Sequence, residues 1–541
     1  MKRFLMTIVA LALIAAVSAA EVAIIPRPLS VEKVEGTITI SEKSIVVADG
    51  SLARPASIFA SIVAKENGFE PIIAKSAGKS KSAIKLATDN KLGEEEYILD
   101  ITRSGIIITG GSDKAVFYGL QSLRQLIFAA PHKGTKVTLD CMTIKDKPHF
   151  GYRGGMLDVC RHIFSVEEVK TYIDMLALHK ANTFHWHLTE DQGWRIEIKK
   201  YPNLTKVGSM RKETVIGRAH TGDDPNKLPY DGKPHGGFFT QEQVRDIVKY
   251  ATERYIEVIP EIDMPGHMVA ALASYPHLGC KGGPYEVRTR WGISEEVLCA
   301  GKESTFEFVE GVLDEVLELF PSKFIHIGGD ECPKKAWKAC PLCQERIRKE
   351  GLKNEFELQS YFMHRVENYL KSKGRHIIGW DEILEGGISK TATIMAWRGA
   401  KQGIKAAKLG NNVIMTPNEY CYLDYCQTSN PKLYNEPVCG GGGGRRHLPL
   451  ITVYSFDPYN NIDTKYHGAI KGVQGNIWTE YMPNFKHVQY MALPRMAAIA
   501  EVSWSHGNKN YESFCQRLRA LRKIYDKNGY NYATFFFNGI E

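Results

Sequence analysis

Acidic side chains follow directly after several short apolar runs of this chain, and the clearest case is FIHIGGDE at 324–331. The apolar residues predict a buried strand, and the two glycines let the chain turn so that Asp330 and Glu331 both come free at its end. Neighbouring carboxyl groups raise each other's pKa, which allows one of them to hold a proton and act as a general acid. The alternative is that Asp330 caps a following helix, with Pro333 in its first turn. The ends of the other apolar runs decide between these two interpretations.

Those ends carry acids, bases and aromatic rings throughout the second part of the chain. Carboxylates and arginine bind sugar hydroxyls, and aromatic faces pack on sugar rings, so a carbohydrate site is indicated. Trp186 lies inside a run and is expected in the core. The residues at the ends are Asp158 with Arg161, His187 with Glu190 and Asp191, Glu261 with Asp263 and His267, Asp330 with Glu331, Trp380 with Asp381 and Glu382, Trp397 with Arg398, Tyr422 with Asp424, and Trp478 with Glu480.

The elements that must position these residues are eight apolar runs separated by helical patterns, which predict βα units. Eight such units close a (β/α)8 TIM barrel, whose active site is built at the carboxyl ends of the strands. We expect Ser165 and Thr240 to cap helices, and the segment after the fifth run is too short for a full helix. The runs are 154–158, 183–188, 256–262, 324–328, 376–380, 392–397, 412–416 and 472–478, with helices expected near 165–180, 240–254, 304–320, 356–374, 400–409 and 486–504.

A small α+β domain is predicted before the barrel. Short strands are expected at 38–40, 44–47, 83–86, 97–100 and 105–108, and helices at 52–67 and 113–129. Residues 146–149 form the predicted boundary between the two domains. The predicted organisation is therefore a signal peptide at 1–20, an α+β domain at 21–148 and an α/β barrel catalytic domain at 149–541.

The first twenty residues have the pattern of a secretory signal, with Lys2 and Arg3, an apolar run at 4–17 and small residues at 18–20. An uncleaved membrane anchor is less favoured because about 14 apolar residues fall short of the roughly 20 that span a bilayer. We expect an exported protein, periplasmic or extracellular, with no membrane span after signal removal. The net charge of +8 is scattered along the chain, so no nucleic-acid partner is expected.

Eleven cysteines are an odd number, so at least one should not form a disulfide within the chain. Cys340 and Cys343 follow the C-x-x-C pattern of a local disulfide or of half a metal site. No second C-x-x-C or nearby histidine pair completes a zinc pattern, so we favour a structural role for this pair. His185, His187 and Glu190 have side chains that can bind metal, but we expect them to be ordinary barrel-interior residues. We expect no metal and no cofactor.

Eight motifs occur in order: DVCRH at 158–162, HWHLTEDQGWR at 185–195, PEIDMPGH at 260–267, HIGGDE at 326–331, GWDEI at 379–383, AWRG at 396–399, YLD at 422–424 and QGNIWTE at 474–480. Together they closely resemble the β-N-acetylhexosaminidases of glycoside hydrolase family 20. The resemblance covers about 150–505, and the preceding segment resembles the family's small α/β domain. It implies an exo-acting enzyme that removes terminal non-reducing GlcNAc or GalNAc with retention, through an oxazolinium ion formed by the sugar's own acetamido group.

The resemblance also implies roles for the catalytic residues. Glu331 would be the general acid/base, and Asp330 would orient the acetamide N–H. Asp191 and His267 would form a relay that tunes Glu331, and Tyr422 would donate a hydrogen bond to the acetamide carbonyl. The adjacent acids then need not straddle the bond, because the substrate brings its own nucleophile.

By the same resemblance, further residues would bind the sugar. They would be Arg161 at the 3- and 4-hydroxyls, Trp380, Trp397 and Trp478 around the acetamide group and ring, and Asp424 and Glu480 at the outer hydroxyls.

Two alternatives to this function remain. One is a relative that releases a disaccharide, such as a lacto-N-biosidase, and the other is a carbohydrate-binding relative without catalysis.

Two features depart from the family pattern. Cys160 stands where the family often has serine, and Cys332 follows Glu331; we expect Cys160 to be a packing residue. The stretch CGGGGGRRH at 439–447 is expected to form a flexible loop over the mouth of the site.

Overall fold

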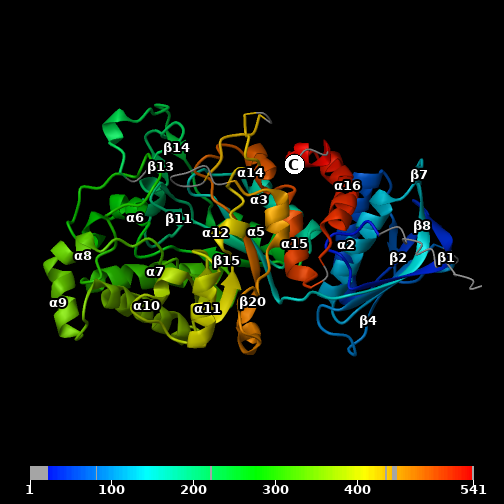
Figure 1. Cartoon of the computed structure of the whole chain (residues 1–541), viewed down its shortest axis with the longest axis horizontal. Coiled ribbons are helices and arrows are strands. Elements are labelled where there is room, and N and C mark those ends of the chain that lie inside the picture. Colours follow the sequence, from blue (N-terminus) through cyan, green and yellow to red (C-terminus); the bar gives the residue numbers. More distant parts are fainter. Residues whose placement is uncertain are drawn as a thin grey trace, which may run out of the picture.

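The computed structural model describes residues 22–78, 80, 82–219, 222–432, 435–440, 447–507 and 509–538. Along the chain, a mixed sheet with two helices precedes a closed barrel (Figure 1). The expected signal segment 1–20 lies outside the described residues. Within the part that the structure describes, no helix combines the length and the apolar character that crossing a bilayer requires.

The N-terminal part is an eight-stranded sheet in the order β1-β8-β5-β6-β4-β2-β3, with β7 paired to β8. All five strands and both helices predicted here are present, whereas β3, β7 and β8 were not predicted. Ser112 caps α2 by accepting a hydrogen bond from the backbone N–H of Ala115. The bounds are β1 Ser30–Ile40, β2 Ile45–Val47, α1 Ala53–Asn67, β3 Ile72–Ala74, β4 Ile84–Thr88, β5 Tyr97–Thr102, β6 Gly105–Gly110, α2 Asp113–Ala129, β7 His132–Lys133 and β8 Lys136–Asp146, with a 3-10 turn η1 at Gly50–Leu52.

Eight parallel strands then close a barrel in the order β10-β15-β16-β17-β18-β19-β20-β9. The pairing of β20 with β9 joins the last strand to the first and leaves no open edge. The (β/α)8 barrel and its eight predicted strands are thereby confirmed. The strands are β9 Tyr152–Asp158, β10 Thr183–His187, β15 Glu257–Glu261, β16 Phe324–His326, β17 His376–Trp380, β18 Thr393–Ala396, β19 Asn412–Met415 and β20 Ile470–Ile477.

Helices surround the barrel where the sequence predicts them. Ser165 and Thr240 each form a capping box with the third residue of the helix, as expected for N-caps. The helix predicted at 486–504 is two helices, because Pro494 has no N–H to continue the first one. After β17 only the short 3-10 turn η4 (Asp381–Leu384) forms. The helices are α3 Val166–Leu178, α5 Gln241–Thr252, α7 Glu303–Leu319, α10 Glu355–Ser372, α11 Ala400–Leu409, α14 Phe485–Ala492 and α15 Arg495–Trp504.

The connections after β10, β15, β16 and β19 are long and contain short elements of their own. These connections leave the carboxyl ends of the strands, where a barrel of this kind carries its site. Their elements are β11 Thr189–Glu190, β12 Gly193–Trp194, α4 Asn203–Lys206, β13 Met210–Arg211, η2 Pro225–Lys227, β14 His235–Gly236, α6 Val269–Ser274, η3 Pro276–Leu278, α8 Lys335–Ala339, α9 Pro341–Lys349, α12 Asn418–Cys421, α13 Leu450–Ser455 and η5 Thr464–Ala469.

The sheet domain and the barrel share a buried interface. Asp146, the last residue of β8, forms an ion pair of 3.2 Å with Lys180 of the barrel, and both side chains are fully buried. Trp504 Nε1 donates to the same carboxylate at 2.9 Å. The C-terminal helix α16 (Tyr511–Asn528) lies beside α2 of the sheet domain (Figure 1) and is followed by the 3-10 turn η6 (Phe535–Asn538).

Candidate active site

The chain leaves β16 earlier than predicted, at His326, and turns through Gly328 and Gly329. Both glycines have positive φ, 63° and 96°, which favours glycine. A Cβ atom on Gly328 would lie 1.6 Å from Oδ1 of Asp263, and the N–H of Gly329 donates to the same oxygen at 3.2 Å. The glycines therefore allow the turn that brings the two following acids to the barrel mouth.

The helix-capping alternative for Asp330 does not hold. Helix α8 begins at Lys335, and its N-cap is Lys334. Glu331 has a φ of 43°, a conformation that few residues other than glycine adopt. Such strain is characteristic of functional sites, where the surrounding structure holds the residue in place.

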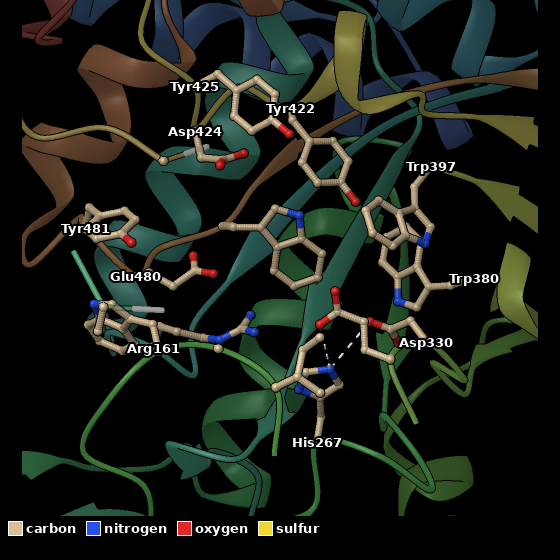
Figure 2. Close-up of a pocket in the computed structure, with 17 residues that line it drawn as sticks. Arg161, His267, Asp330, Trp380, Trp397, Tyr422, Asp424, Tyr425, Glu480 and Tyr481 are labelled. Carbon is tan, nitrogen blue, oxygen red and sulfur yellow. Dashed lines mark ion pairs between the residues drawn. The ribbon is translucent and has the colours of Figure 1, made fainter. Parts of the chain in front are cut away.

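Both acids face His267, which lies in the connection after β15. Nε2 of His267 lies 3.7 Å from Oδ2 of Asp330 and 3.5 Å from Oε2 of Glu331, drawn as dashed lines in Figure 2. On its other side, Nδ1 lies 2.6 Å from Oε1 of Glu190. Burial opposes protonation of His267, but these carboxylates outweigh it and raise its pKa well above the usual value. The ring is therefore a cation among three acids.

Asp330 is the more buried of the adjacent acids: its side chain is 13% exposed, against 33% for Glu331. Burial and the charge of Glu331 raise the pKa of Asp330 to about 6, although the His267 cation opposes this.

The structure places Glu190, rather than Asp191, next to His267. Oδ2 of Asp191 is 4.0 Å from Nδ1 of His267, and Asp191 lies buried behind the ring. There it pairs with Arg288 at 3.1 Å and accepts a hydrogen bond from the backbone N–H of Val269 at 3.1 Å. Glu190 and Asp191 are adjacent in the sequence, so spacing alone did not distinguish them. The predicted relay stays a prediction, with Glu190 as an additional member.

A cavity of about 300 Å³ opens beside these acids. Ten of the eleven predicted site residues line it, and Asp191 is the exception. Tyr425 and Tyr481 also line it, and each directly follows a predicted site residue, which was a signal that the sequence offered. Trp291 comes from the long connection after β15, where no strand end indicated it. Gly440, in the stretch expected over the mouth of the site, lines the cavity as well. The lining residues that were not predicted are Ala219, Trp291, Gly292, Ile293, Tyr425 and Tyr481.

One wall of the cavity is aromatic and firmly held. Nε1 of Trp380 donates to Glu261 at 2.8 Å, and Nε1 of Trp397 donates to Glu382 at 2.9 Å. The rings of Trp397 and Tyr422 stack at 5.9 Å between centroids and 18° between planes. Burial raises the pKa of Tyr422 well above its usual value, so its hydroxyl is a neutral donor.

The opposite side is charged. Figure 2 shows Arg161 and Glu480 across the cavity from Trp380 and Trp397. Arg161 pairs with Oδ2 of Asp158 at 3.3 Å and with Glu190, and its guanidinium lies 5.1 Å from the ring centre of Trp478.

Asp424 also lines the cavity and lies next to a disulfide-held segment. Burial and the charge of Glu480 raise the pKa of Asp424 well above its usual value. Cys426 and Cys439 form a disulfide, and the next residue, Gly440, donates its N–H to the carbonyl oxygen of Asp424 at 2.6 Å. A Cβ on Gly440 would lie 2.2 Å from Oδ2 of Asp424, so a larger residue here would displace that carboxylate. The loop predicted at 439–447 is otherwise largely outside the described residues, which omit 441–446.

The barrel interior beneath the cavity contains a buried carboxylate, Glu261, among three imidazoles. His185 pairs with it at 3.1 Å and His326 at 2.9 Å, and His187 is also paired. Burial opposes ionisation, but the histidines lower the pKa of Glu261 well below its usual value. Glu190 faces Arg161 and His267 and therefore does not form one cluster with His185 and His187, as a metal site of these three residues would require.

The two cysteines beside the site are packed and protonated. Sγ of Cys160 donates to the carbonyl oxygen of His187 at 3.3 Å, and burial raises the pKa of Cys160 well above its usual value. Burial also raises the pKa of Cys332 to about 11. Trp186 is fully buried against Phe184 and Phe239, as expected for a core residue.

Paired carboxyl groups beside a small polar and aromatic pocket, at the carboxyl ends of barrel strands, are typical of glycoside hydrolases. The family model described as glycosyl hydrolase family 20, catalytic domain, matches residues 150–507, and the one described as glycosyl hydrolase family 20, domain 2, matches 21–147. The chain therefore belongs to glycosyl hydrolase family 20.

Known proteins of this family are similar over nearly the whole chain. A beta-hexosaminidase of Porphyromonas gingivalis is 44% identical over 519 residues, which are 94% of this chain and 64% of that protein. An exo beta-N-acetylglucosaminidase of Vibrio harveyi, solved in complex with N-acetylglucosamine, has a TM-score of 0.84 at 31% identity and covers 95% of this chain and 78% of that one. A mutant Streptomyces plicatus beta-hexosaminidase, solved with its product GlcNAc, has a TM-score of 0.80 at 29% identity, over 94% and 96% of the two chains.

Proposed function

We propose that this protein is an exo-acting β-N-acetylhexosaminidase that removes terminal GlcNAc or GalNAc with retention of configuration. The observation that carries the proposal is the position of Asp330 and Glu331 side by side on His267, next to a pocket walled by aromatic rings. Two adjacent acids on the same side of the pocket suit a reaction in which the substrate supplies the nucleophile. The relatives named above act on, or bind, the same class of sugar.

In the first step, the acetamido oxygen of the sugar attacks the anomeric carbon while Glu331 gives its proton to the leaving oxygen. Asp330 accepts the acetamide N–H, and the neutral Tyr422 hydroxyl donates to the acetamide oxygen; together they hold the group in position. The product of this step is an oxazolinium ion. In the second step, Glu331 takes a proton from water, the water attacks the anomeric carbon, and the acetamido group is restored.

His267 provides the positive charge that this acid pair needs. It lies within 4 Å of both acids and is itself held by Glu190. As Glu331 loses its proton in the first step, the nearby imidazolium stabilises the carboxylate that forms.

Arg161, Asp424 and Glu480 form the hydroxyl-binding end of the site. Asp424 is 6% exposed and Arg161 is 8% exposed, so both side chains lie in a buried part of the cavity. A volume of about 300 Å³ with these buried charged groups favours one terminal sugar over an internal one or a disaccharide.

The test is hydrolysis of p-nitrophenyl β-GlcNAc and β-GalNAc by the wild type and by Glu331→Gln. We expect both substrates to be cleaved by the wild type and the variant to lose the activity. Cleavage of a disaccharide glycoside alone would instead support the lacto-N-biosidase alternative, and binding without turnover would support a non-catalytic relative.

The nucleophile has a test of its own. Fluorine atoms on the N-acetyl group withdraw electrons from its carbonyl oxygen, so N-trifluoroacetyl substrates should react much more slowly than N-acetyl substrates. Equal rates for the two, or equal rates with the corresponding glucoside, would rule out participation of the acetamido group.

We also propose that the protein is exported, to the periplasm or beyond the cell. The support is the basic, apolar and small-residue pattern of 1–20. Mass spectrometry of the protein from its native cells should show a mature N-terminus near residue 21. A chain that retains Met1 in the cytoplasmic fraction would exclude export.

A further inference from the structure

Four cysteine sulfurs meet behind the active site, on two different connections of the barrel. Cys280 and Cys299 lie in the connection after β15, and Cys340 and Cys343 lie in the connection after β16. The sulfur of Cys299 is 3.6 Å from that of Cys343 and 3.7 Å from that of Cys340. The sulfur of Cys280 is 3.9 Å from that of Cys343, and all four sulfurs lie within 4.8 Å of one another.

These distances match the edges of a tetrahedron around one metal ion. A Zn–S bond of about 2.3 Å places neighbouring sulfurs roughly 3.8 Å apart, whereas a disulfide holds them at about 2.05 Å. An iron–sulfur cluster would separate its cysteine ligands by several atoms and does not fit this spacing. We propose that Cys280, Cys299, Cys340 and Cys343 together bind one structural Zn²⁺ ion.

The pattern of contacts also favours a shared ion over two disulfides. The shortest contact, between Cys299 and Cys343, joins the other two contacts, so the four sulfurs form one cluster and not two separate pairs. The same chain does form a separate bonded pair, Cys426 with Cys439. Cys280 and Cys299 are single cysteines at least 41 residues before Cys340, so no local sequence pattern indicates that they lie beside the C-x-x-C pair.

The surroundings suit a site of net negative charge. Four thiols lose their protons when they bind Zn²⁺, which leaves the site with a charge of about −2 and involves no redox step. Cys343 lies in the first turn of α9, where the helix dipole favours negative charge. Nζ of Lys302 binds the carbonyl oxygen of Gly279, the residue before Cys280, at 2.7 Å.

The backbone is shaped to bring the two connections together. A Cβ on Gly301 would lie 2.3 Å from the carbonyl carbon of Leu342, so glycine allows the Cys299 segment to pack against the Cys343 segment. Three of the four cysteines are at most 5% exposed: Cys299, Cys340 and Cys343. Buried thiolates without a metal would be costly, whereas a bound Zn²⁺ neutralises part of their charge.

Zinc at this place would join the two connections that carry the catalytic groups. The connection after β15 contains His267, and the connection after β16 contains Asp330 and Glu331. Leu298, next to Cys299, donates its N–H to Pro265 at 2.9 Å and accepts a hydrogen bond from Nε1 of Trp337 at 2.9 Å. The ion would not touch the substrate; it would position His267 against the acids.

The first experiment measures metal in the full-length protein, purified without chelators from zinc-supplied cells. We expect about one zinc per chain, retained on gel filtration. The Cys343→Ala variant should lose the zinc, and the matched control Cys141→Ala, a buried cysteine of β8, should retain it. A wild-type protein without stoichiometric zinc, or peptide mapping that finds Cys299 disulfide-bonded to Cys340 or Cys343, would overturn the proposal.

A second measurement does not depend on whether the variant folds. Cobalt exchanged into the wild type should give the strong visible bands of a tetrahedral cobalt thiolate, and added zinc should abolish them. Weak bands typical of octahedral oxygen ligands would contradict a four-sulfur site. Zinc content and spectra do not require turnover, so a failure of the proposed hexosaminidase activity would leave this test unaffected.

Discussion

At the scale of single residues, the protonation state of Asp330 should control the reaction. The carboxylate must be ionised to accept the acetamide N–H, and burial together with Glu331 raises its pKa to about 6. We therefore expect kcat/KM to fall about tenfold per pH unit below pH 6, because the protonated fraction rises as the pH falls. A pH–rate profile of the wild type from pH 4.5 to about 8 measures this.

The Asp330→Asn variant provides the control for this profile. Its amide does not titrate, so its residual activity should lack the acidic limb near pH 6. If the variant keeps the limb unchanged, the group that titrates is not Asp330. We expect its rate at neutral pH to be at least about 100-fold below that of the wild type, since the acetamide group loses its positioning.

The same substitution should stabilise the folded protein. A raised pKa means that the folded state binds the proton more tightly than the unfolded state, so the stabilising contribution is present at low pH and is lost as the pH rises through about 6. At pH 7.5, replacing the carboxylate by an amide should raise the free energy of unfolding by about 1 to 3 kcal/mol. Urea unfolding of both proteins at pH 7.5 and at pH 5 should show a smaller difference at pH 5; a destabilised variant would contradict this reasoning.

The sequence predicted which residues form the site better than it predicted which of them are in contact. Asp330, Glu331 and His267 were identified from the ends of the strands, and the structure brings them together. The choice between Glu190, the last residue of β11, and Asp191, which follows it, depends on their partners: Arg161 pairs with Glu190, and Arg288 pairs with Asp191. Such tertiary partners leave no trace in local spacing.

At the scale of elements, the disulfide-held segment at Gly440 should determine the shape of the hydroxyl-binding end. A methyl group at Gly440 would displace the Asp424 carboxylate, because its Cβ would lie 2.2 Å from Oδ2. We expect Gly440→Ala to lower kcat/KM by about tenfold or more, mainly through a higher KM. Steady-state kinetics with p-nitrophenyl β-GlcNAc measures the effect.

Gly468 offers a matched control for this substitution. It is exposed in η5, and a Cβ there would meet no atom within 4 Å. Gly468→Ala should leave kcat and KM unchanged. If Gly440→Ala and Gly468→Ala had equal kcat and KM, the position of the Asp424 carboxylate would not matter for substrate binding.

Elements were predicted well where one periodicity dominated. The eight barrel strands were found because each is a compact apolar run, and the two capping residues because their motifs are local. β8 was missed although Val137, Leu139 and Cys141 alternate with exposed residues, since its polar positions dilute the apolar signal. β16 ended two residues early because the turn at Gly328 is required by Asp263, a contact between two connections.

At the scale of the whole molecule, the ion pair of Asp146 with Lys180 should couple the sheet domain to the barrel. Asp146→Ala would leave the Lys180 ammonium buried without its carboxylate, and burial lowers the pKa of Lys180. We expect a loss of about 3–5 kcal/mol in the free energy of unfolding. Denaturant unfolding, followed by fluorescence and by circular dichroism, measures this loss and shows whether both domains still unfold together.

The neighbouring residue provides the comparison. Lys147 forms a 4.0 Å pair with Glu96 on the surface, with its side chain 56% exposed. Surface pairs contribute little, so Lys147→Ala should change stability by less than about 1 kcal/mol. A similar loss for both variants would show that the buried pair has no special role.

The closure of the barrel by β20 and β9 has a consequence for synthesis on the ribosome. The first barrel strand hydrogen-bonds to a strand that is translated more than three hundred residues later. Arg517, in α16, also binds the carbonyl oxygen of Ile24 at 3.0 Å. A nascent chain that has emerged only as far as β19 therefore has an open barrel with two unpaired strand edges. We therefore expect the barrel to close only when almost the entire polypeptide has been made, and until then its two open edges are exposed to pairing with other molecules.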